Sequence, residues 1–253
     1  MKILACIKEA TIVPGPVVFA SNGTDINPDF TSQRISEADE QAVEEAVRLA
    51  EAQEDSEAVV VTVGDQGSTK TLRHALAIGA SRAIRLWRDD LSLFDPLAIA
   101  RSLAQAVRDE RPDLVLCGVQ STDLAQQITG PALAAHLGWP CTTTAVAIEV
   151  EADGGEATVT RDVGAGVREL VRIPLPAVVT VQLGINRPRT PSFKQVMQAK
   201  KAPIEEQPID LGQTQCVRVT KLSKNTSSAS DFEPIEGGPS DVASKIKSLI
   251  EES

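Results

Sequence analysis

Short apolar runs constrain the fold of this chain more than any other feature of its sequence. The clearest is Ala58–Val63, and comparable runs cover Ile3–Ile7, Ala83–Trp87, Asp113–Cys117 and Ala177–Val181. In chain order, helical patterns separate the four runs from Ile3–Ile7 to Asp113–Cys117. Strands that are apolar on both faces are typical of parallel sheets with helices on either side. The sequence therefore predicts an α/β fold with a doubly wound, mostly parallel sheet.

Helix signals lie between these runs. Ser36-Glu-Ala-Asp39 has the spacing of a capping box, with Asp39 at the reciprocal position. Asp95-Pro96 places an N-cap residue before a proline at the first helical position, which opens a long helix. Further helices are predicted over about residues 68–79 and up to residue 137. A loop rich in Pro, Gly and Asn is predicted over about residues 9–35.

The pattern changes after residue 140. Thr142–Val150 and Ala157–Asp162 flank the turn signal Ala152-Asp-Gly-Gly155, which predicts a β-hairpin. We expect a nucleotide-binding α/β domain over residues 1–185. Residues 186–253 are expected to form an extended C-terminal arm.

The predicted arm has little apolar pattern of its own. Its first part, to about Glu236, is rich in Pro, Lys, Ser and Thr and cannot supply a core. We expect it to lie on another surface. Ser240 is then predicted to cap a short helix over Asp241–Ile250, with Val242, Ile246 and Leu249 or Ile250 facing inward.

Composition excludes several classes of function. The formal net charge of −10 over 253 residues argues against nucleic-acid binding, which needs a basic surface. No apolar run reaches membrane-spanning length, and neither a signal peptide nor a transit peptide is recognisable, so we expect no membrane insertion and a cytoplasmic location, or the mitochondrial matrix in a eukaryote. The cysteines Cys6, Cys117, Cys141 and Cys216 form no CxxC pair and suggest no metal site.

No catalytic constellation stands out in the sequence. The histidines are His74 and His136, and neither lies near an obvious nucleophile. We therefore predict no catalytic residues. A nucleotide-type pocket without catalytic groups favours a carrier or a scaffold.

Ligand binding in doubly wound folds occurs at the carboxyl ends of the strands. Loops that begin at Lys8, Gly64 and Gly118 qualify. The second resembles a phosphate loop but has Thr69 where glycine is required. The third loop suits a phosphate and a ribose, although the same polar residues are also typical of a well-capped helix start without a ligand. Its polar residues are Gln120, Ser121, Thr122, Asp123, Gln126, Gln127 and Thr129.

From Lys2 to about Ile250 the chain resembles the beta subunits of electron-transfer flavoproteins. The most specific matching segments are Ala42–Leu49, Leu76–Ala80, Asp113–Leu116 with Gly118 and Gln120, Leu175–Thr180, and Asn186–Arg189 followed by Met197–Lys201.

The resemblance implies an adenine-nucleotide alpha-hydrolase-like fold and an electron carrier rather than an enzyme. It implies a heterodimer with an alpha subunit, which holds most of one FAD, and a structural AMP in the beta subunit. Electrons would come from flavin dehydrogenases of the acyl-CoA type, as in fatty acid oxidation, or of the N-methyl amino acid type. They would leave to a quinone oxidoreductase.

The resemblance also implies two sets of functional residues. The AMP pocket would use Cys6, Ser36, Glu37, Ala38, Asp39, Val63, Gly118, Gln120, Asp123, Gln126, Gln127, Ile128 and Thr129. A partner-recognition loop would comprise Thr190, Pro191, Ser192, Phe193, Lys194, Gln195, Val196 and Met197.

The chain departs from the family pattern at several of these positions. Typical members have Asn-Pro where this chain has Ser36-Glu37, and a longer acidic run where it has Asp123-Leu124-Ala125. In the recognition loop, Phe193 replaces the usual leucine anchor and Lys194 replaces a proline.

Two alternatives remain open from the sequence. One is a stand-alone adenine-nucleotide-binding module of the stress-protein or ATP-pyrophosphatase type, although neither a glycine-rich phosphate loop nor an S-G-G-x-D-S run is present. The other is a bifurcating relative with a second FAD in the AMP site.

Overall fold

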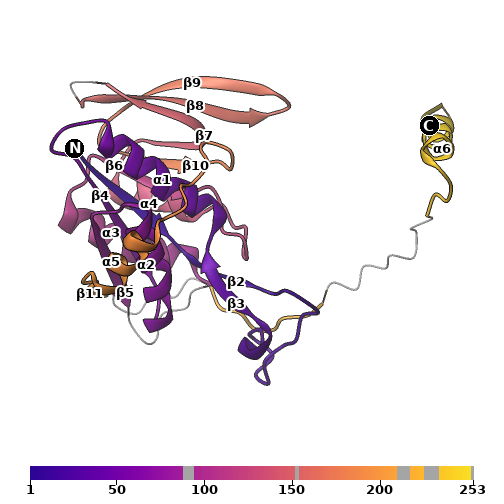
Figure 1. Cartoon of the computed structure of the whole chain (residues 1–253), viewed down its shortest axis with the longest axis horizontal. Helices are drawn as coiled ribbons and strands as arrows, with labels where there is room; N and C mark the ends of the chain where they lie inside the picture. Colours follow the sequence, from indigo (N-terminus) through magenta and orange to yellow (C-terminus); the bar gives the residue numbers. More distant parts are fainter. Residues whose placement is uncertain (88–93, 152–153, 210–216, 225–233, 252–253) are drawn as a thin grey trace. The chain divides into compact units, whose positions relative to one another are not determined.

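The computed structural model of the chain describes residues 1–87, 94–151, 154–209, 217–224 and 234–251 (Figure 1). The chain divides into two compact units, Met1–Lys221 and Leu222–Ser253. The segment from Asn186 to Lys221 therefore lies with the α/β unit, whereas the arm expected from the sequence begins at residue 186.

Nine of the described strands form one sheet, in the order β11-β5-β4-β1-β6-β10-β7-β8-β9. The pairings from β11 to β7 are parallel, and β8 and β9 continue the sheet antiparallel. This confirms the predicted doubly wound, mostly parallel sheet. The strands are β1 (Lys2–Ile7), β4 (Glu57–Val63), β5 (Arg82–Trp87), β6 (Leu114–Gly118), β7 (Cys141–Val150), β8 (Glu156–Gly164), β9 (Val167–Pro174), β10 (Ala177–Val181) and β11 (Glu205–Pro208).

Helices cover both faces of the parallel part (Figure 1). Alternate residues of β1 enter two separate cores, because successive side chains of a strand point to opposite faces. Ile3 and Ala5 join the core under α1 and α2, and Leu4 and Cys6 join the core under α3 and α4. The four helices are α1 (Glu37–Glu51), α2 (Thr69–Ile78), α3 (Pro96–Glu110) and α4 (Thr129–Leu137).

The segment predicted as a loop over residues 9–35 contains a second, small sheet. In it, β2 (Glu9–Ile12) pairs antiparallel with β3 (Ser32–Ile35), and a short 3-10 helix, η1 (Pro28–Phe30), precedes β3. Only Ala10 and Ile35 of the two strands are buried. A hairpin with so little apolar alternation carries no strand signal in its sequence, so the loop prediction was wrong here.

The predicted hairpin is confirmed as β7 and β8, although residues 152–153 of its turn lie outside the described residues. The sequence did not predict β9, which pairs with β8 along its whole length. Leu170 at the middle of β9 is 74% exposed, and Ile173 is its one buried residue. A strand exposed on both faces shows no period-2 pattern, which is why it was missed.

Part of the predicted arm is regular structure. The helix α5 (Phe193–Lys201) starts inside the predicted recognition loop, and β11 adds an edge strand beside β5. Ser192 caps α5 in a capping box with Gln195. The S-x-x-Q spacing is a helix-start signal, so the sequence contained this information.

The smaller unit contains the predicted terminal helix, α6 (Pro239–Glu251), but two details differ. The helix begins before Ser240, and the carboxylate of Asp241 accepts from the Gly238 amide at 3.0 Å instead. No described residue of α6 is buried, so the inward face predicted for Ile246 is absent; this side chain is 46% exposed.

Candidate functional site

A cavity of about 740 Å³ lies at the carboxyl ends of the parallel strands. From β1, the sheet extends through β4 to β5 on one side and through β6 to β10 on the other. The connections on the two sides of β1 therefore diverge, which leaves a crevice at this edge. Cys6 and Cys117, register partners on β1 and β6, both line the cavity.

The cavity brings together most of the residues implied by the resemblance. Those that line it are Cys6, Asp39, Val63, Gly118, Gln120, Asp123, Gln126, Gln127, Ile128 and Thr129. Ser36, Glu37 and Ala38 do not line it. Ser36 and Ala38 are buried, whereas Glu37 is exposed and pairs with Arg34 at 2.6 Å.

Asp39 ties the ends of two strands together. Its carboxylate accepts from the backbone amides of Lys8 at 2.9 Å and Gly118 at 2.8 Å. It therefore does not form the predicted capping box, and the Ser36 hydroxyl is buried without a hydrogen-bond partner. The tertiary contacts of Asp39 with β1 and β6 replace the local contact that its spacing predicted.

Gly118 allows this contact because it lacks a side chain. A Cβ at this position would lie 2.3 Å from Oδ1 of Asp39 and 2.9 Å from Cβ of Ala38. Glycine is therefore required for the start of α1 to approach the end of β6.

The carboxylate of Asp39 is almost fully enclosed. Burial raises its pKa to about 7, although the amides of Lys8 and Gly118 and the charge of Lys8 favour the ionised form. The group is thus balanced between its neutral and charged states near neutral pH.

Asp123 joins the loop after β6 to the segment after β1. Its carboxylate accepts from the Lys8 ammonium and, at 3.1 Å, from the Thr11 amide. Burial opposes ionisation, but the hydrogen bond and charge of Lys8 outweigh it and lower the pKa of Asp123. Asp123 therefore holds the wall of the cavity as an ion pair.

The first turn of α4 faces the cavity. Ile128 is its N-cap residue and offers no side-chain hydrogen bond to the helix, and both Ile128 and Thr129 line the cavity. The positive end of a helix and its free amide groups favour an anion such as a phosphate. Gly130 packs this helix against β10, because a Cβ there would lie 2.4 Å from the Cγ2 of Thr180.

A second wall of the cavity is formed by β2 and by the turn after β4; the sequence predicted the loop at Gly64 as a candidate, but not β2 or the individual residues of this wall. Glu9, Thr11, Asp65 and Ser68 line it. Burial raises the pKa of Glu9, although a hydrogen bond from the Thr71 hydroxyl opposes the shift. The start of this wall, Lys8, was recognised as a loop start, but no pattern indicated that β2 would fold back.

The charged lining of the cavity is mainly acidic. Among the described lining residues Lys8 is the one basic residue, and it is already paired with Asp123. The acidic residues of the lining are Glu9, Asp25, Asp39, Asp65 and Asp123. An anionic ligand group would thus depend on backbone amides more than on basic side chains.

The Cys117 thiol at the cavity is not activated. A hydrogen bond with Cys6 and burial raise the pKa of Cys117, which keeps this thiol neutral. A thiolate is the reactive form of cysteine, so neither burial nor charge favours a nucleophile here. Cys216 lies outside the described residues.

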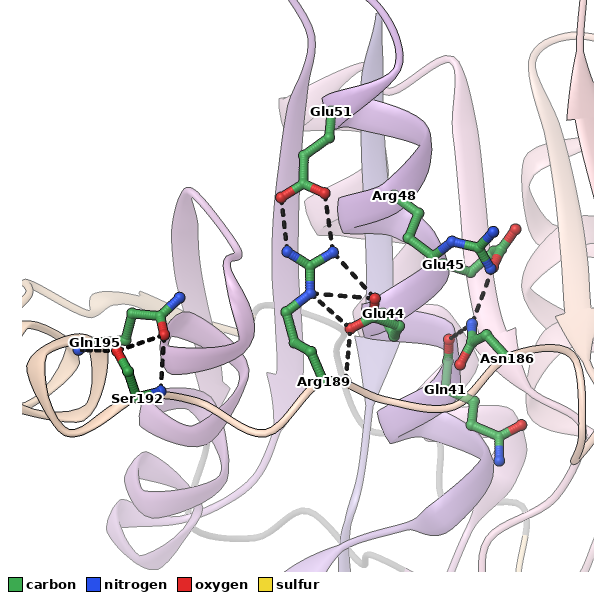
Figure 2. A network of polar contacts seen from close by, with 9 residues as sticks. All are labelled: Gln41, Glu44, Glu45, Arg48, Glu51, Asn186, Arg189, Ser192 and Gln195. Carbon is green, nitrogen blue, oxygen red and sulfur yellow. Dashed lines mark hydrogen bonds and ion pairs between the residues drawn. The ribbon is translucent and has the colours of Figure 1, made fainter.

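The predicted recognition segment is exposed. Phe193 is 81% exposed and Met197 37%, and both belong to α5. Phe193 is therefore not packed against the part of the chain that the structure describes. Figure 2 shows the segment that leads into α5 running along α1, with Arg189 between Glu44 and Glu51.

Comparison with known proteins identifies the family. The electron transfer flavoprotein domain family matches residues 29–211. The electron transfer flavoprotein subunit beta of Methylophilus methylotrophus is 34% identical over 262 residues, which cover 100% of this chain and 98% of that protein. This chain belongs to the electron-transfer flavoprotein beta-subunit family. It is therefore a component of an electron-transport flavoprotein with a partner subunit, as the resemblance predicted.

Other beta subunits match over most of their length. That of Bradyrhizobium diazoefficiens is 36% identical over 209 residues, 83% of this chain and 82% of its own. A mitochondrial beta subunit from Arabidopsis thaliana is 35% identical over 206 residues, 81% of each chain.

Within the described ranges, no helix has both the length and the apolar character to cross a bilayer. The same residues contain no cluster of three or more His, Cys, Asp or Glu side chains suited to a metal ion.

Proposed function

We propose that this beta subunit binds a structural AMP in the cavity and supports an FAD held mainly by an alpha subunit. The heterodimer would carry electrons from flavin dehydrogenases of the acyl-CoA or N-methyl amino acid type to a quinone oxidoreductase. It would act as a carrier and not as an enzyme, in the cytoplasm or, in a eukaryote, in the mitochondrial matrix.

The observation that supports AMP binding most directly is the convergence of three strand ends on one cavity. Its wall includes the first turn of α4, with amide groups at Thr129 that suit a phosphate, and the polar loop from Gln120 to Gln127 that suits a ribose. The buried and neutral Cys117 thiol agrees with a binding role instead of a catalytic one.

The cofactor proposal is tested by counting nucleotides. The chain is purified alone and with its alpha subunit, and bound nucleotides are released with acid and separated by chromatography. We expect one FAD and one AMP per heterodimer, and little or no flavin on the chain alone. A stoichiometrically flavinylated chain on its own contradicts the proposal, and two FAD without AMP favours the bifurcating alternative.

The partner proposal is tested at Phe193. An exposed aromatic side chain at the start of a helix suits an interface anchor, because few residues carry most of the binding energy of an interface. In Phe193→Ala we expect the heterodimer concentration that half-saturates a reduced acyl-CoA dehydrogenase to rise roughly thirtyfold. Flavin content and melting temperature should stay near wild type, since the side chain buries little surface. An unchanged half-saturation rules the anchor out.

A further inference from the structure

The segment from Gly184 to Ser192 is held against α1 by polar contacts. The Gly184 amide donates to Oε1 of Gln41 at 2.8 Å. Nδ2 of Asn186 donates to the backbone oxygen of Gln41 and to Oε2 of Glu45, each at 2.9 Å (Figure 2). The segment is thereby fixed along successive turns of α1.

Arg189 makes the most extensive of these contacts. Its Nε and Nη2 donate to the carboxylate of Glu44 at 3.0 to 3.2 Å, and its Nη1 and Nη2 donate to that of Glu51 at 2.7 and 2.9 Å. Its backbone amide also donates to Oε2 of Glu44 at 3.1 Å. One guanidinium thus joins two carboxylates that are seven residues apart on the same face of α1 (Figure 2).

The geometry of this contact requires arginine. The planar guanidinium presents several donors at fixed angles, whereas an ammonium is a point charge. Glu44 is buried, so its carboxylate depends on the donors of Arg189 for hydrogen bonding. Hydrogen bonds to Arg189 lower the pKa of Glu51, which keeps the outer carboxylate charged.

The other end of α5 is held by a second arginine. Nη1 of Arg73, on α2, donates to the carbonyl oxygens of Ala199 and Lys200, each at 2.6 Å, and of Ala202 at 3.3 Å. Ala199 is the one buried residue of α5. With so little apolar burial, the position of the helix depends on the polar contacts at its two ends.

We propose that Arg189 is a positioning residue for partner recognition: its contacts with Glu44 and Glu51 fix the start of α5 so that Phe193 is presented to the dehydrogenase. The inference rests on the proposed role of Phe193 as an interface anchor. It adds that the anchor is effective only while the segment before it is held to α1, since a preorganised contact loses less entropy on binding.

The first test measures the positioning of α5 in the absence of a dehydrogenase. Hydrogen–deuterium exchange of the intact heterodimer is compared for wild type, Arg189→Gln and the control Arg172→Gln, which removes an exposed arginine paired with Glu151 on another part of the surface. In Arg189→Gln, amides of α5 should exchange on the order of tenfold faster, while those of β1 stay unchanged. Exchange of α5 at the wild-type rate overturns the proposal.

The second test separates positioning from general stability. The probe is an acyl-CoA dehydrogenase reduced by its acyl-CoA, or a sarcosine dehydrogenase reduced by sarcosine if only that enzyme reduces the heterodimer. Arg189→Gln should raise the half-saturating concentration on the order of tenfold at an unchanged maximal rate. Arg189→Lys should raise the half-saturating concentration about threefold, because lysine keeps the positive charge but lacks the planar set of guanidinium donors.

A double variant decides whether Arg189 acts through Phe193. If it does, the half-saturating concentration of the double variant Arg189→Gln with Phe193→Ala should lie within about twofold of that of Phe193→Ala alone. The proposal is overturned if the two substitutions raise the half-saturating concentration multiplicatively. It is also overturned if Arg189→Gln lowers the melting temperature and leaves the half-saturating concentration unchanged. If Phe193→Ala itself has no effect, the interface anchor fails, whereas the exchange measurement still reports whether Arg189 holds α5.

Discussion

At the scale of single residues, the cavity depends on one buried carboxylate and one glycine. Asp39 accepts hydrogen bonds from two backbone amides, that of Lys8 after β1 and that of Gly118 at the end of β6. The same contact requires that position 118 carries no Cβ. The two residues therefore act as a pair that sets the width of the crevice.

Asp39→Asn should change how stability depends on pH. Burial raises the pKa of Asp39 from 3.8 to about 7 in the folded protein, so between these values the folded state binds a proton that the unfolded chain does not. The contribution of Asp39 to the free energy of unfolding therefore rises as pH falls from 8 to 5. Urea unfolding at several pH values should show the wild-type advantage over Asp39→Asn growing toward pH 5. A difference that does not vary with pH contradicts the raised pKa.

Gly118→Ala should destabilise the protein by about 1–3 kcal/mol, because the new methyl group overlaps Asp39 and Ala38. Gly15→Ala is the matched control, since a Cβ at Gly15 meets no atom within 4 Å. The measurement is the urea midpoint of both variants and of wild type. Equal midpoints for Gly118→Ala and Gly15→Ala would show that the start of α1 moves away without cost.

At the scale of elements, the loop between β6 and α4 forms one wall of the site. It is fastened at Asp123 to Lys8 and Thr11, and its backbone adopts positive φ angles at Ala125 and Gln127. A loop of this shape is held by its contacts and not by its local sequence preferences. Loss of one fastening should therefore affect ligand binding before it affects the sheet.

Asp123→Ala should lower the AMP content of the heterodimer, because the loop is released and the Lys8 ammonium is left without its carboxylate. Thr129→Ala should do the same by altering the first turn of α4. Nucleotide release and chromatography check both variants, with flavin content as the internal reference and Asp29→Ala, on the exposed η1, as the control. Wild-type AMP content in both variants would mean that the nucleotide lies elsewhere.

At the scale of the whole molecule, the chain consists of an α/β unit with two cores and a separate C-terminal unit. The cores fill both sides of the sheet within residues 1–221. The helix α6 buries none of its described residues. The stability of the larger unit should therefore be independent of the smaller one in the isolated chain.

Deletion of residues 222–253 should leave the melting temperature of the isolated chain within about 2 °C of that of the full chain, because none of the described residues in this segment belongs to either core. Thermal unfolding is followed by far-UV circular dichroism for secondary structure and by near-UV circular dichroism for tertiary structure. A fall of more than about 5 °C would indicate that residues 222–253 stabilise the α/β unit.

Much of the fold can be predicted from the sequence because the pattern of apolar residues indicates which segments are buried. Runs such as Ala58–Val63 are apolar at every position except Thr62, which is typical of a strand covered on both faces. Asp95-Pro96 starts α3 where the capping signal predicts. The family resemblance likewise rests on segments whose order along the chain is specific, and the position of the site at the strand ends follows from the topology.

The elements that the sequence did not predict are those with little buried surface. In β9 and β11 the stabilising contacts are backbone pairing and ion pairs such as Arg82–Glu205, which leave no apolar period to detect. The role of Asp39 was also decided by tertiary structure, because its local spacing predicted a helix cap whereas two distant amides compete successfully for it. Sequence by itself determined the buried strands of the sheet, the family and the strand ends at which a ligand would bind. Which polar groups face one another across the cavity depended on the approach of segments far apart in the chain, and local preferences hold no information about such contacts.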